Sequence, residues 1–415
     1  MNSTDRKKSF SDLFITRNIV LHPDLLSLLS FSSNHFICFI VSVLVSLNLF
    51  SQETQNKFTV QGYISSLQSA MFDSINKNWT TENLLHNRLN FKWYPVESLT
   101  GVLELRNRLI FGESITNNPG ATASYEQDFG VLDMTKNLIT GNSYILNSTV
   151  DRLNLSYEKG KFKATIGRQR INWSQTLVWN PNDIFNTYSF FDFDYIERPG
   201  SDALRLQYYN SEVSSTELAF KANNQKKITA AAFYKFNAIE YDFQFIGGIL
   251  NNEDYVIGTG WSGAIKSVSF RGEISYFRSI DNFAKTSGEV LASVGADYTF
   301  GNSFMLTAEY LFCGTKFNDS LSFLKFYSAP LTVKHLSFVK HNFILQLSYP
   351  FTPLFNGSLA GMYFLGIKGY YLGPSLNYSL EQNLEATFYF QSFGGEISGQ
   401  QQRYNLAFLR FKYSF

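Results

Sequence analysis

The feature that most constrains the fold is a series of runs, each about ten residues long, in which apolar and polar side chains alternate. Residues 383–393 show it well, because Leu384 and Phe388 alternate with Glu385 and Thr387. A period of two places successive side chains on opposite faces of a β-strand. After residue 51, no apolar stretch reaches the ~20 residues that a membrane helix needs. The chain is therefore predicted to be all-β.

The N-terminus carries the pattern of a secretory signal peptide. Residues 36–50 are apolar and uncharged, but too short for a comfortable membrane helix. Four basic residues precede this run, and the small residue Ser51 follows it. We expect a signal peptide at 1–51 with a long n-region, and a mature domain at 52–415; a signal anchor is the alternative.

Charge and cysteine content exclude several classes of partner. Residues 1–51 hold four of the 35 basic and three of the 34 acidic residues, so the mature chain has no net charge. Neutrality argues against binding to nucleic acid. Cys313 is the only cysteine after residue 51, which excludes an intrachain disulfide and a thiolate metal site. We find no phosphate-binding loop and no metal-ligand cluster, and expect no cofactor.

The strand count follows from the alternating runs. The expected strands are 57–66, 85–95, 99–111, 147–157, 161–168, 203–209, 214–221, 227–236, 240–248, 254–262, 267–277, 288–299, 303–312, 338–349, 354–363, 368–379, 383–393 and 403–415. Every second connection is short, and all long connections then fall at the other end, as in a transmembrane antiparallel β-barrel. The count is 18, with 16 as the alternative. A soluble sandwich shares the alternation, but the 41 Phe and 24 Tyr fit the aromatic girdles of a membrane barrel.

Two motifs resemble outer-membrane proteins. Phe411, Tyr413 and the terminal Phe415 share one strand face, which resembles the assembly signal of Gram-negative outer-membrane barrels. The element from Gly167-Arg168-Gln169 to Asn172-Trp173 resembles one found in porin-like families, with Ser174 where those often have Gly. The resemblance implies a bacterial outer-membrane location and contact with lipid and with the barrel assembly machinery. A homotrimer is common among such porins.

Alternation also predicts which charged residues face the lumen. The basic residues expected there are Arg88, Lys92, Arg106, Arg108, Arg152 and Arg205, on the early strands. The acidic ones are Asp242, Glu289, Asp297, Glu273 and Glu309, on later strands. Two interpretations stay open: the separated charges produce a field across a narrow pore, or they simply solvate a wide lumen and pair with neighbours.

The connection at 169–202 is expected to constrict the pore, as the third loop does in general porins. It is long and aromatic, which argues for an ordered functional loop. Its acidic residues, Asp183, Asp192, Asp194 and Glu197, would then face the basic wall. Trp173, Trp179 and Phe185 are expected to anchor the loop, with stacking against sugars or aromatic solutes as the alternative. Alternation would direct Arg168 toward lipid, so we expect a bulge at Gly167 that redirects it inward.

These observations predict a channel for passive diffusion of small hydrophilic solutes. An export or substrate-specific transport barrel, for a polysaccharide or an aromatic or sugar solute, is the main alternative. A barrel hydrolase is the third, but His86, His335 and His341 lie in no convincing nucleophile–base arrangement.

Overall fold

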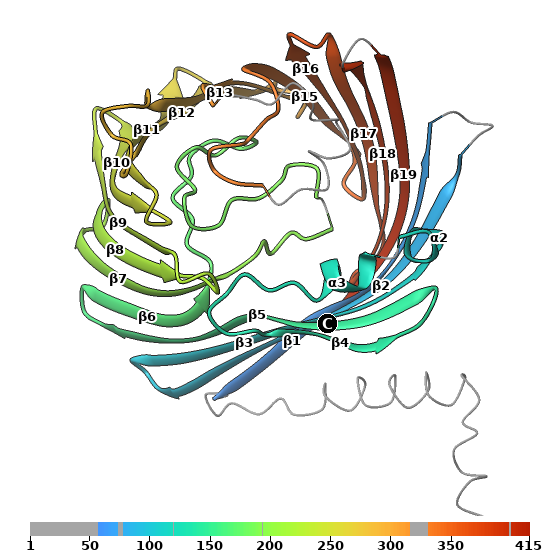
Figure 1. Cartoon of the computed structure of the whole chain (residues 1–415), viewed down its shortest axis with the longest axis horizontal. Helices are drawn as coiled ribbons and strands as arrows, with labels where there is room; N and C mark the ends of the chain where they lie inside the picture. The colour runs from blue at the N-terminus through green and yellow to red at the C-terminus, as the bar shows by residue number, and fades with distance from the viewer. Residues whose placement is uncertain (1–56, 74–77, 119, 193, 316–330, 398–399) are drawn as a thin grey trace, which may run out of the picture. The chain divides into compact units, whose positions relative to one another are not determined.

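The computed structural model describes residues 57–73, 78–118, 120–192, 194–315, 331–397 and 400–415 (Figure 1). Residues 57–415 form one compact unit. The signal peptide expected at residues 1–51 lies outside the described residues. In the described part of the chain, no helix is long and apolar enough to span a membrane.

The unit of residues 57–415 is built almost entirely of strands. In chain order its elements are β1 (Phe58–Phe72), β2 (Thr80–Val96), β3 (Leu99–Gly112), α2 (Glu113–Thr116), α3 (Ala121–Tyr125), β4 (Thr135–Thr140), β5 (Tyr144–Lys159), β6 (Phe162–Gln169), β7 (Ser201–Ser211), β8 (Ser214–Ala222), β9 (Ile228–Ala238), β10 (Tyr241–Leu250), β11 (Asp254–Ile265), β12 (Val268–Ser279), β13 (Glu289–Thr299), β14 (Met305–Cys313), β15 (His341–Thr352), β16 (Phe355–Leu365), β17 (Gly369–Glu381), β18 (Leu384–Ile397) and β19 (Gln400–Ser414).

The strands close into one antiparallel barrel (Figure 1). Each strand pairs with the next along the chain, and β1 pairs with β19 from Tyr63↔Ser414 to Phe72↔Asn405. The exception is β4, which pairs with β5 beside the ring, so the ring itself has 18 strands. All 18 predicted strands are confirmed, and the alternative of 16 is wrong. β4 was not predicted.

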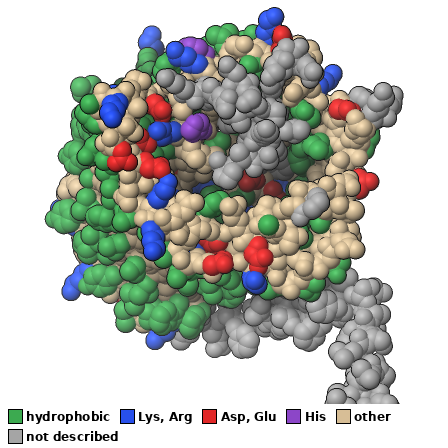
Figure 2. All heavy atoms as spheres, in the orientation of Figure 1, with side chains coloured by type: hydrophobic (Ala, Val, Ile, Leu, Met, Phe, Trp, Pro, Cys, Tyr) green, Lys and Arg blue, Asp and Glu red, His purple; other side chains and the backbone are tan. Residues whose placement is uncertain are grey.

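The outer surface of the barrel is apolar and its interior is polar. Side chains such as Ile166 and Ile257 point outward and are 60% and 67% exposed, while Arg88, Glu273 and Ser293 are buried inside. Aromatic pairs such as Phe58–Trp93, Phe236–Phe243 and Phe351–Phe355 stack close to the short turns. Hydrophobic side chains cover the outer surface over β6–β11 (Figure 2). A soluble sandwich would bury its apolar face instead.

The barrel wall is uneven. β2 and β5 have 17 and 16 residues, but β6 has only eight. β6 pairs with residues 153–159 of β5, and β4 pairs with residues 145–149, beyond the end of β6. The loop that carries β4, residues 113–143 (the β3–β5 loop), therefore completes the wall where β6 stops.

Candidate functional site

Residues 170–200, the β6–β7 loop, lie inside the barrel (Figure 1). β6 ends at Gln169 and β7 begins at Ser201, so the loop starts one residue later and ends two residues earlier than the predicted segment 169–202. The loop contacts inward-facing side chains of β10, β12 and β14, then of β17 and β18, and then of β2 and β5. It therefore crosses the lumen from one wall to the other.

Gly167 and Arg168 precede the turn into the lumen. The pairing of β6 with β5 and β7 continues in register through Gly167, so the bulge that we expected there is wrong. Gly167 instead has a φ of +112°, and a Cβ there would lie 2.2 Å from the carbonyl oxygen of Leu153. Only glycine tolerates both conditions.

Arg168 stays on the outer side of the wall. It pairs in register with Leu153, which points outward. It is nevertheless buried, because the β3–β5 loop covers it, and it forms ion pairs of 2.7 Å with Asp128 and with Asp202. Arg168 also donates to the carbonyl of Leu132. These carboxylates neutralise the charge of Arg168 on the outer side of the wall, so its side chain does not have to turn into the lumen.

Two wall carboxylates hold the first part of the β6–β7 loop. Glu273 on β12 is fully buried and accepts the backbone N–H groups of Gln175, Thr176 and Asn182. Glu309 on β14 accepts those of Leu177, Val178 and Trp179, and the hydroxyl of Ser293. Charged acceptors make strong hydrogen bonds to backbone N–H groups. Glu273 and Glu309 therefore anchor the loop and do not line open water.

Aromatic side chains add to this anchoring. Trp173 stacks on Phe233 of β9 with ring centroids 5.1 Å apart, and its Nε1 donates to Glu217 at 2.9 Å. Phe185 packs edge-on against Trp173 at 4.9 Å. Trp173, Trp179 and Phe185 are all buried. Side chains buried to this degree offer almost no surface to a solute, which favours the anchoring interpretation over solute stacking.

The Asn180-Pro181-Asn182-Asp183 segment fixes the next bend. Asn182 is fully buried; its amide donates to the carbonyl of Thr259 at 3.0 Å and accepts from Ser275 at 2.7 Å. Asp183 is also buried, and its Oδ1 accepts the N–H of Asn186. Burial raises the pKa of Asp183 to about 7, although the nearby charge of Arg170 opposes the shift.

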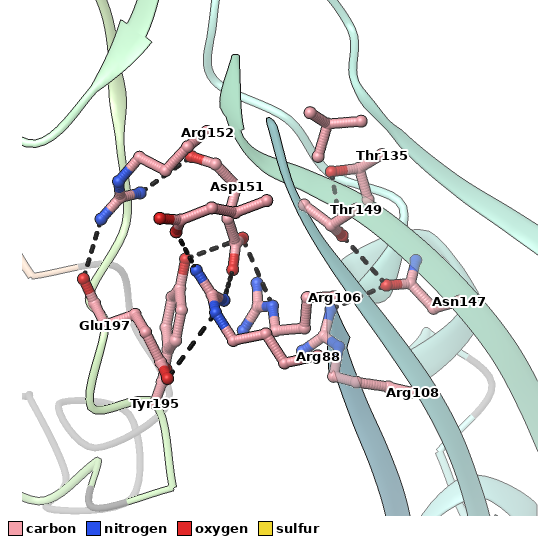
Figure 3. Close-up of polar contacts among 12 residues, drawn as sticks. Arg88, Arg106, Arg108, Thr135, Asn147, Thr149, Asp151, Arg152, Tyr195 and Glu197 are labelled. Atoms are coloured by element: carbon pink, nitrogen blue, oxygen red, sulfur yellow. Dashed lines mark hydrogen bonds and ion pairs between the residues drawn. The ribbon is translucent and has the colours of Figure 1, made fainter. Parts of the chain in front are cut away.

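The tip of the loop meets an arginine cluster on β2, β3 and β5 (Figure 3). Arg88 is fully buried and pairs with Asp151 and Glu104, with Glu197 of the loop 3.6 Å away. Arg106 lies 3.4 Å from Asp151. It also lies over the ring of Tyr195, 3.8 Å from its centroid. The predicted meeting of Glu197 with the basic wall thus occurs at Arg88.

Further contacts fix both sides of the tip. Arg152 donates to the backbone carbonyls of Glu197 and Arg198, at 2.8 and 2.7 Å. Asp194 faces His86 at 3.3 Å and Arg410 at 3.9 Å. Burial alone would raise the pKa of Asp194, but the hydrogen bond from His86 and the charge of Arg410 hold it below its usual value. Asp192 is exposed.

Two predicted lumen residues lie apart from the tip contacts. Arg205 pairs with Glu217 on β8 at 2.7 Å. Arg108 donates to Asn147 at 2.8 Å and lies 5.3 Å from the ring centroid of Tyr125.

The predicted acidic arc is largely neutralised. Asp242 pairs with Lys235, Asp297 with Arg271, and Glu289 with Lys334. Together with the two anchoring carboxylates, these contacts favour pairing with neighbours over a field across the pore.

Sequence reasoning missed two parts of the site. Asp151 accepts from Arg88 and from Tyr195, yet strict alternation would direct it outward. A register shift opposite Glu104 and Leu105 turns both Asp151 and Arg152 inward. An Asp beside an Arg in a membrane strand was the available signal, since lipid-facing charges cost about 2–4 kcal/mol at mid-depth.

The second missed part is residues 331–340, which precede β15 and also pack inside the barrel (Figure 1). Val333, Leu336 and Phe338 are buried there. Lys334 binds Asp254 and Glu289 at 3.0 and 3.1 Å. This segment lacks the motif and the high aromatic content that marked the β6–β7 loop.

The C-terminal strand closes the ring. Phe411 and Tyr413 are exposed on its outer face. The N–H of Phe415 donates to the carbonyl of Gly62 and its carbonyl accepts from the N–H of Gly62, both at 2.9 Å.

No group of three or more His, Cys, Asp or Glu side chains within the described ranges is placed to hold a metal ion. No protein-family model and no curated protein matches the sequence.

Solved structures do match. OpdQ of Pseudomonas aeruginosa is 10% identical with a TM-score of 0.54, over 87% of this chain and 99% of that chain. OccK5 (OpdH) of the same organism is 10% identical with a TM-score of 0.53, over 86% and 98%. OccAB1 of Acinetobacter baumannii is 9% identical with a TM-score of 0.52, over 87% and 97%. At such low identity the likeness concerns the fold alone: this chain has the 18-stranded fold of porin-like outer-membrane barrels.

Proposed function

We propose that the protein is a bacterial outer-membrane channel through which small hydrophilic solutes diffuse passively. One observation carries the proposal: a closed barrel with an apolar exterior and a polar interior has a long loop folded across its lumen. Its surroundings are outer-membrane lipid, and the C-terminal strand is the part that the barrel assembly machinery would recognise. Small hydrophilic solutes are the substrates that we propose, and the proposed mechanism of diffusion uses no cofactor.

The β6–β7 loop sets the narrowest part of the channel. Its tip lies against Arg88 and Arg106, and Arg108 continues the basic wall along β3. Within the described residues, Arg108 has no carboxylate partner, whereas Arg88 has three. Two unit charges ~4 Å apart interact by ~4 kcal/mol at an effective dielectric of 20. Such side chains would favour anions over cations in transit.

The test is ion conductance of the purified full-length protein in planar bilayers. We expect discrete steps, and a shift of selectivity toward cations when Arg106 and Arg108 are both replaced by alanine. Lys92→Ala is the matched control, because Lys92 lies on the exposed part of β2 away from the loop. Shortening the loop between Asn186 and Tyr195 should raise the conductance.

Three results would contradict the proposal. Absence of any conductance would favour a plugged barrel. Wild-type selectivity in the double variant would mean that Arg106 and Arg108 do not line the path of the ions. Wild-type conductance after the loop is shortened would mean that the loop does not form the narrowest part of the channel.

The structure gives less support to the alternatives. An export barrel for an acidic polysaccharide should have a uniformly basic lumen, but Glu104, Asp151 and Glu197 lie among the arginines. A hydrolase needs a nucleophile beside a base. The ring of His86 packs on Tyr63 and its Nδ1 faces Asp194, which leaves it in a structural contact.

A further inference from the structure

The outer face of β2, β3, β5 and β6 holds a groove of about 750 Å³. Two adjacent rows of cross-strand partners line it, and both rows belong to the lipid-facing side, because Leu155 and Ile166 are 41% and 60% exposed. The row nearer the short turns, the lower row, is Trp93, Gly101, Leu155 and Ile166; the next one, the upper row, is Phe91, Leu103, Leu153 and Arg168.

A glycine opens the lower row. Gly101 lies between Trp93 and Leu155, so one position in the row has no side chain. A Cβ at Gly101 would lie 3.2 Å from Cε3 of Trp93, so the indole borders the bare backbone. The floor of the groove is therefore formed here by the strand itself.

A segment of the β3–β5 loop closes the groove above the upper row. Residues 128–134, which we call the overhang, lie outside the wall, because they cover the outward side chain of Arg168. The N–H of Leu132 donates to Asp202 at 3.1 Å, and the carbonyl of Met134 accepts from the N–H of Val150 at 2.9 Å. Leu132 and Met134 both line the groove.

The two ends of the groove differ. Lys136, which is 75% exposed, comes two residues after Met134 and pairs with Val150's neighbour Ser148, so it lies on the far side of the overhang. At the other end the outward residue that follows the lower row on β5 is Tyr157, which is 42% exposed. The groove therefore runs from the short-turn border of the apolar surface up to the overhang, where it stops.

A cation lies beyond the open end. Lys159 follows Tyr157 in the same outward alternation and pairs in register with Phe162, which is 40% exposed. The neighbouring carboxylate of Glu158 pairs with Lys163 at 2.8 Å. Four residues at ~3.3 Å each, tilted by ~40°, put Lys159 about 10 Å below the lower row. Lysine side chains at such positions extend to the membrane interface.

These surroundings select the chemistry of an occupant. The groove opens toward hydrocarbon, which supplies no water and no hydrogen bonds. A hollow in such a surface loses dispersion contacts unless an apolar group fills it. The positive charge of Lys159 at the open end adds attraction for an anion. An apolar chain joined to an anionic group is the chemistry of a phospholipid.

We propose that the groove is a binding site for one phospholipid from the leaflet on the short-turn side. One acyl chain lies along the two rows, over Gly101, and ends beneath Leu132 and Met134 of the overhang. The phosphate lies at the interface beside Lys159. The site is on the outside of the barrel, so it is independent of the solute that crosses the lumen.

Photolabelling tests the path of the acyl chain. The purified protein is reconstituted in vesicles of phosphatidylethanolamine and phosphatidylglycerol with a trace of phosphatidylglycerol that carries a diazirine in one acyl chain. We expect the label to concentrate on Leu103, Leu153 and Leu155, and Gly101→Leu to reduce it there several-fold, because its side chain fills the gap. Gly361→Leu is the matched control, since Gly361 is on the outer side of β16 and its Cβ would meet only a carbonyl oxygen at 4.0 Å.

A second variant tests the phosphate. Lys159→Ala should also reduce the label several-fold, and the loss should disappear at high salt, where wild-type labelling falls to the same level. Lys266→Ala, an exposed lysine in the β11–β12 turn at the same end of the barrel, should label as the wild type does. Heat-modifiable migration of each variant shows that its barrel is folded. If Gly101→Leu does not assemble, Lys159→Ala alone decides.

Three results overturn the proposal. The first is label spread evenly over the outer strands, which would mean that the groove holds no particular lipid. The second is labelling of Lys159→Ala equal to that of the wild type at low salt. The third is native mass spectrometry of the extracted protein that finds a lipopolysaccharide or a lipid-modified protein bound and no phospholipid.

Discussion

Replacing Glu309 by glutamine should loosen the β6–β7 loop without unfolding the barrel. Glu309 is 4% exposed and accepts three consecutive backbone N–H groups, at 3.0 Å from Leu177, 3.2 Å from Val178 and 2.7 Å from Trp179. Glutamine keeps the length of the side chain but converts one acceptor oxygen into an NH2 group. That group cannot accept, so it faces at least one loop N–H that then has no partner.

The size of the effect follows from this geometry. One buried N–H without an acceptor costs about 1–3 kcal/mol, and the remaining hydrogen bonds lose the part that depends on charge, about 1 kcal/mol. A loss of about 3 kcal/mol corresponds to roughly a 100-fold higher population of the undocked loop. The barrel strands keep their backbone pairing, since Glu309 reaches the loop through its side chain alone.

Hydrogen exchange of the amides of residues 177–179 measures this population directly. We expect exchange about 100-fold faster in Glu309→Gln, with larger fluctuations of the open-channel current. Asp242→Asn is the control, because Asp242 pairs with Lys235 and does not contact the loop. Unchanged exchange at these three amides would refute the reasoning, since it would mean that the carboxylate does not hold the loop.

Two further predictions concern the loop and its entrance. Burial raises the pKa of Asp183 from 3.8 to about 7, so Asp183 takes up a proton when the loop docks. Docking of the loop should therefore be strongest at low pH, weaken as the pH rises from about 4 to about 7, and stay level above that. Hydrogen exchange of residues 180–186 at pH 5 and pH 8 should show this, and equal pH dependence in Asp183→Asn would contradict it. Gly167→Ala should destabilise the barrel by about 1–3 kcal/mol, because its φ of +112° and the nearby Leu153 carbonyl exclude a Cβ. Gly247→Ala is the control, because no heavy atom lies within 4 Å of the Cβ that it adds. Equal amounts of assembled barrel for the two variants would contradict the predicted strain at residue 167.

The strands could be predicted from the sequence because the information is local. Period-two alternation sets the face of each side chain, and closure of the barrel follows from strand number and turn lengths. The prediction of which side chains face the lumen failed where one extra residue in a strand reverses the inward and outward alternation. The register shift at Asp151 and Arg152 turned both side chains inward. At Gly167 the opposite happened: the register continued, and the β3–β5 loop neutralised Arg168 instead.

The partners of the lumen charges could not be predicted. Alternation placed Glu273 and Glu309 inside but could not reveal that backbone N–H groups of a distant loop would occupy them. Such contacts depend on the path of a loop without regular secondary structure. No repeating sequence pattern predicts that path. The burial of residues 331–340 was missed for the same reason.

β4 gives this barrel something that barrels otherwise lack, an edge strand. Among the described strands it pairs with β5 alone, so its other side is available to a strand from another molecule. Exposed edges invite aggregation, and proteins protect them with short strands, lysines and bulges. β4 has all three: six residues, the exposed Lys136, and a register shift between Asn137 and Ile139. The exposed edge of β4 is therefore protected against pairing with a strand from another molecule, although the sheet is open there.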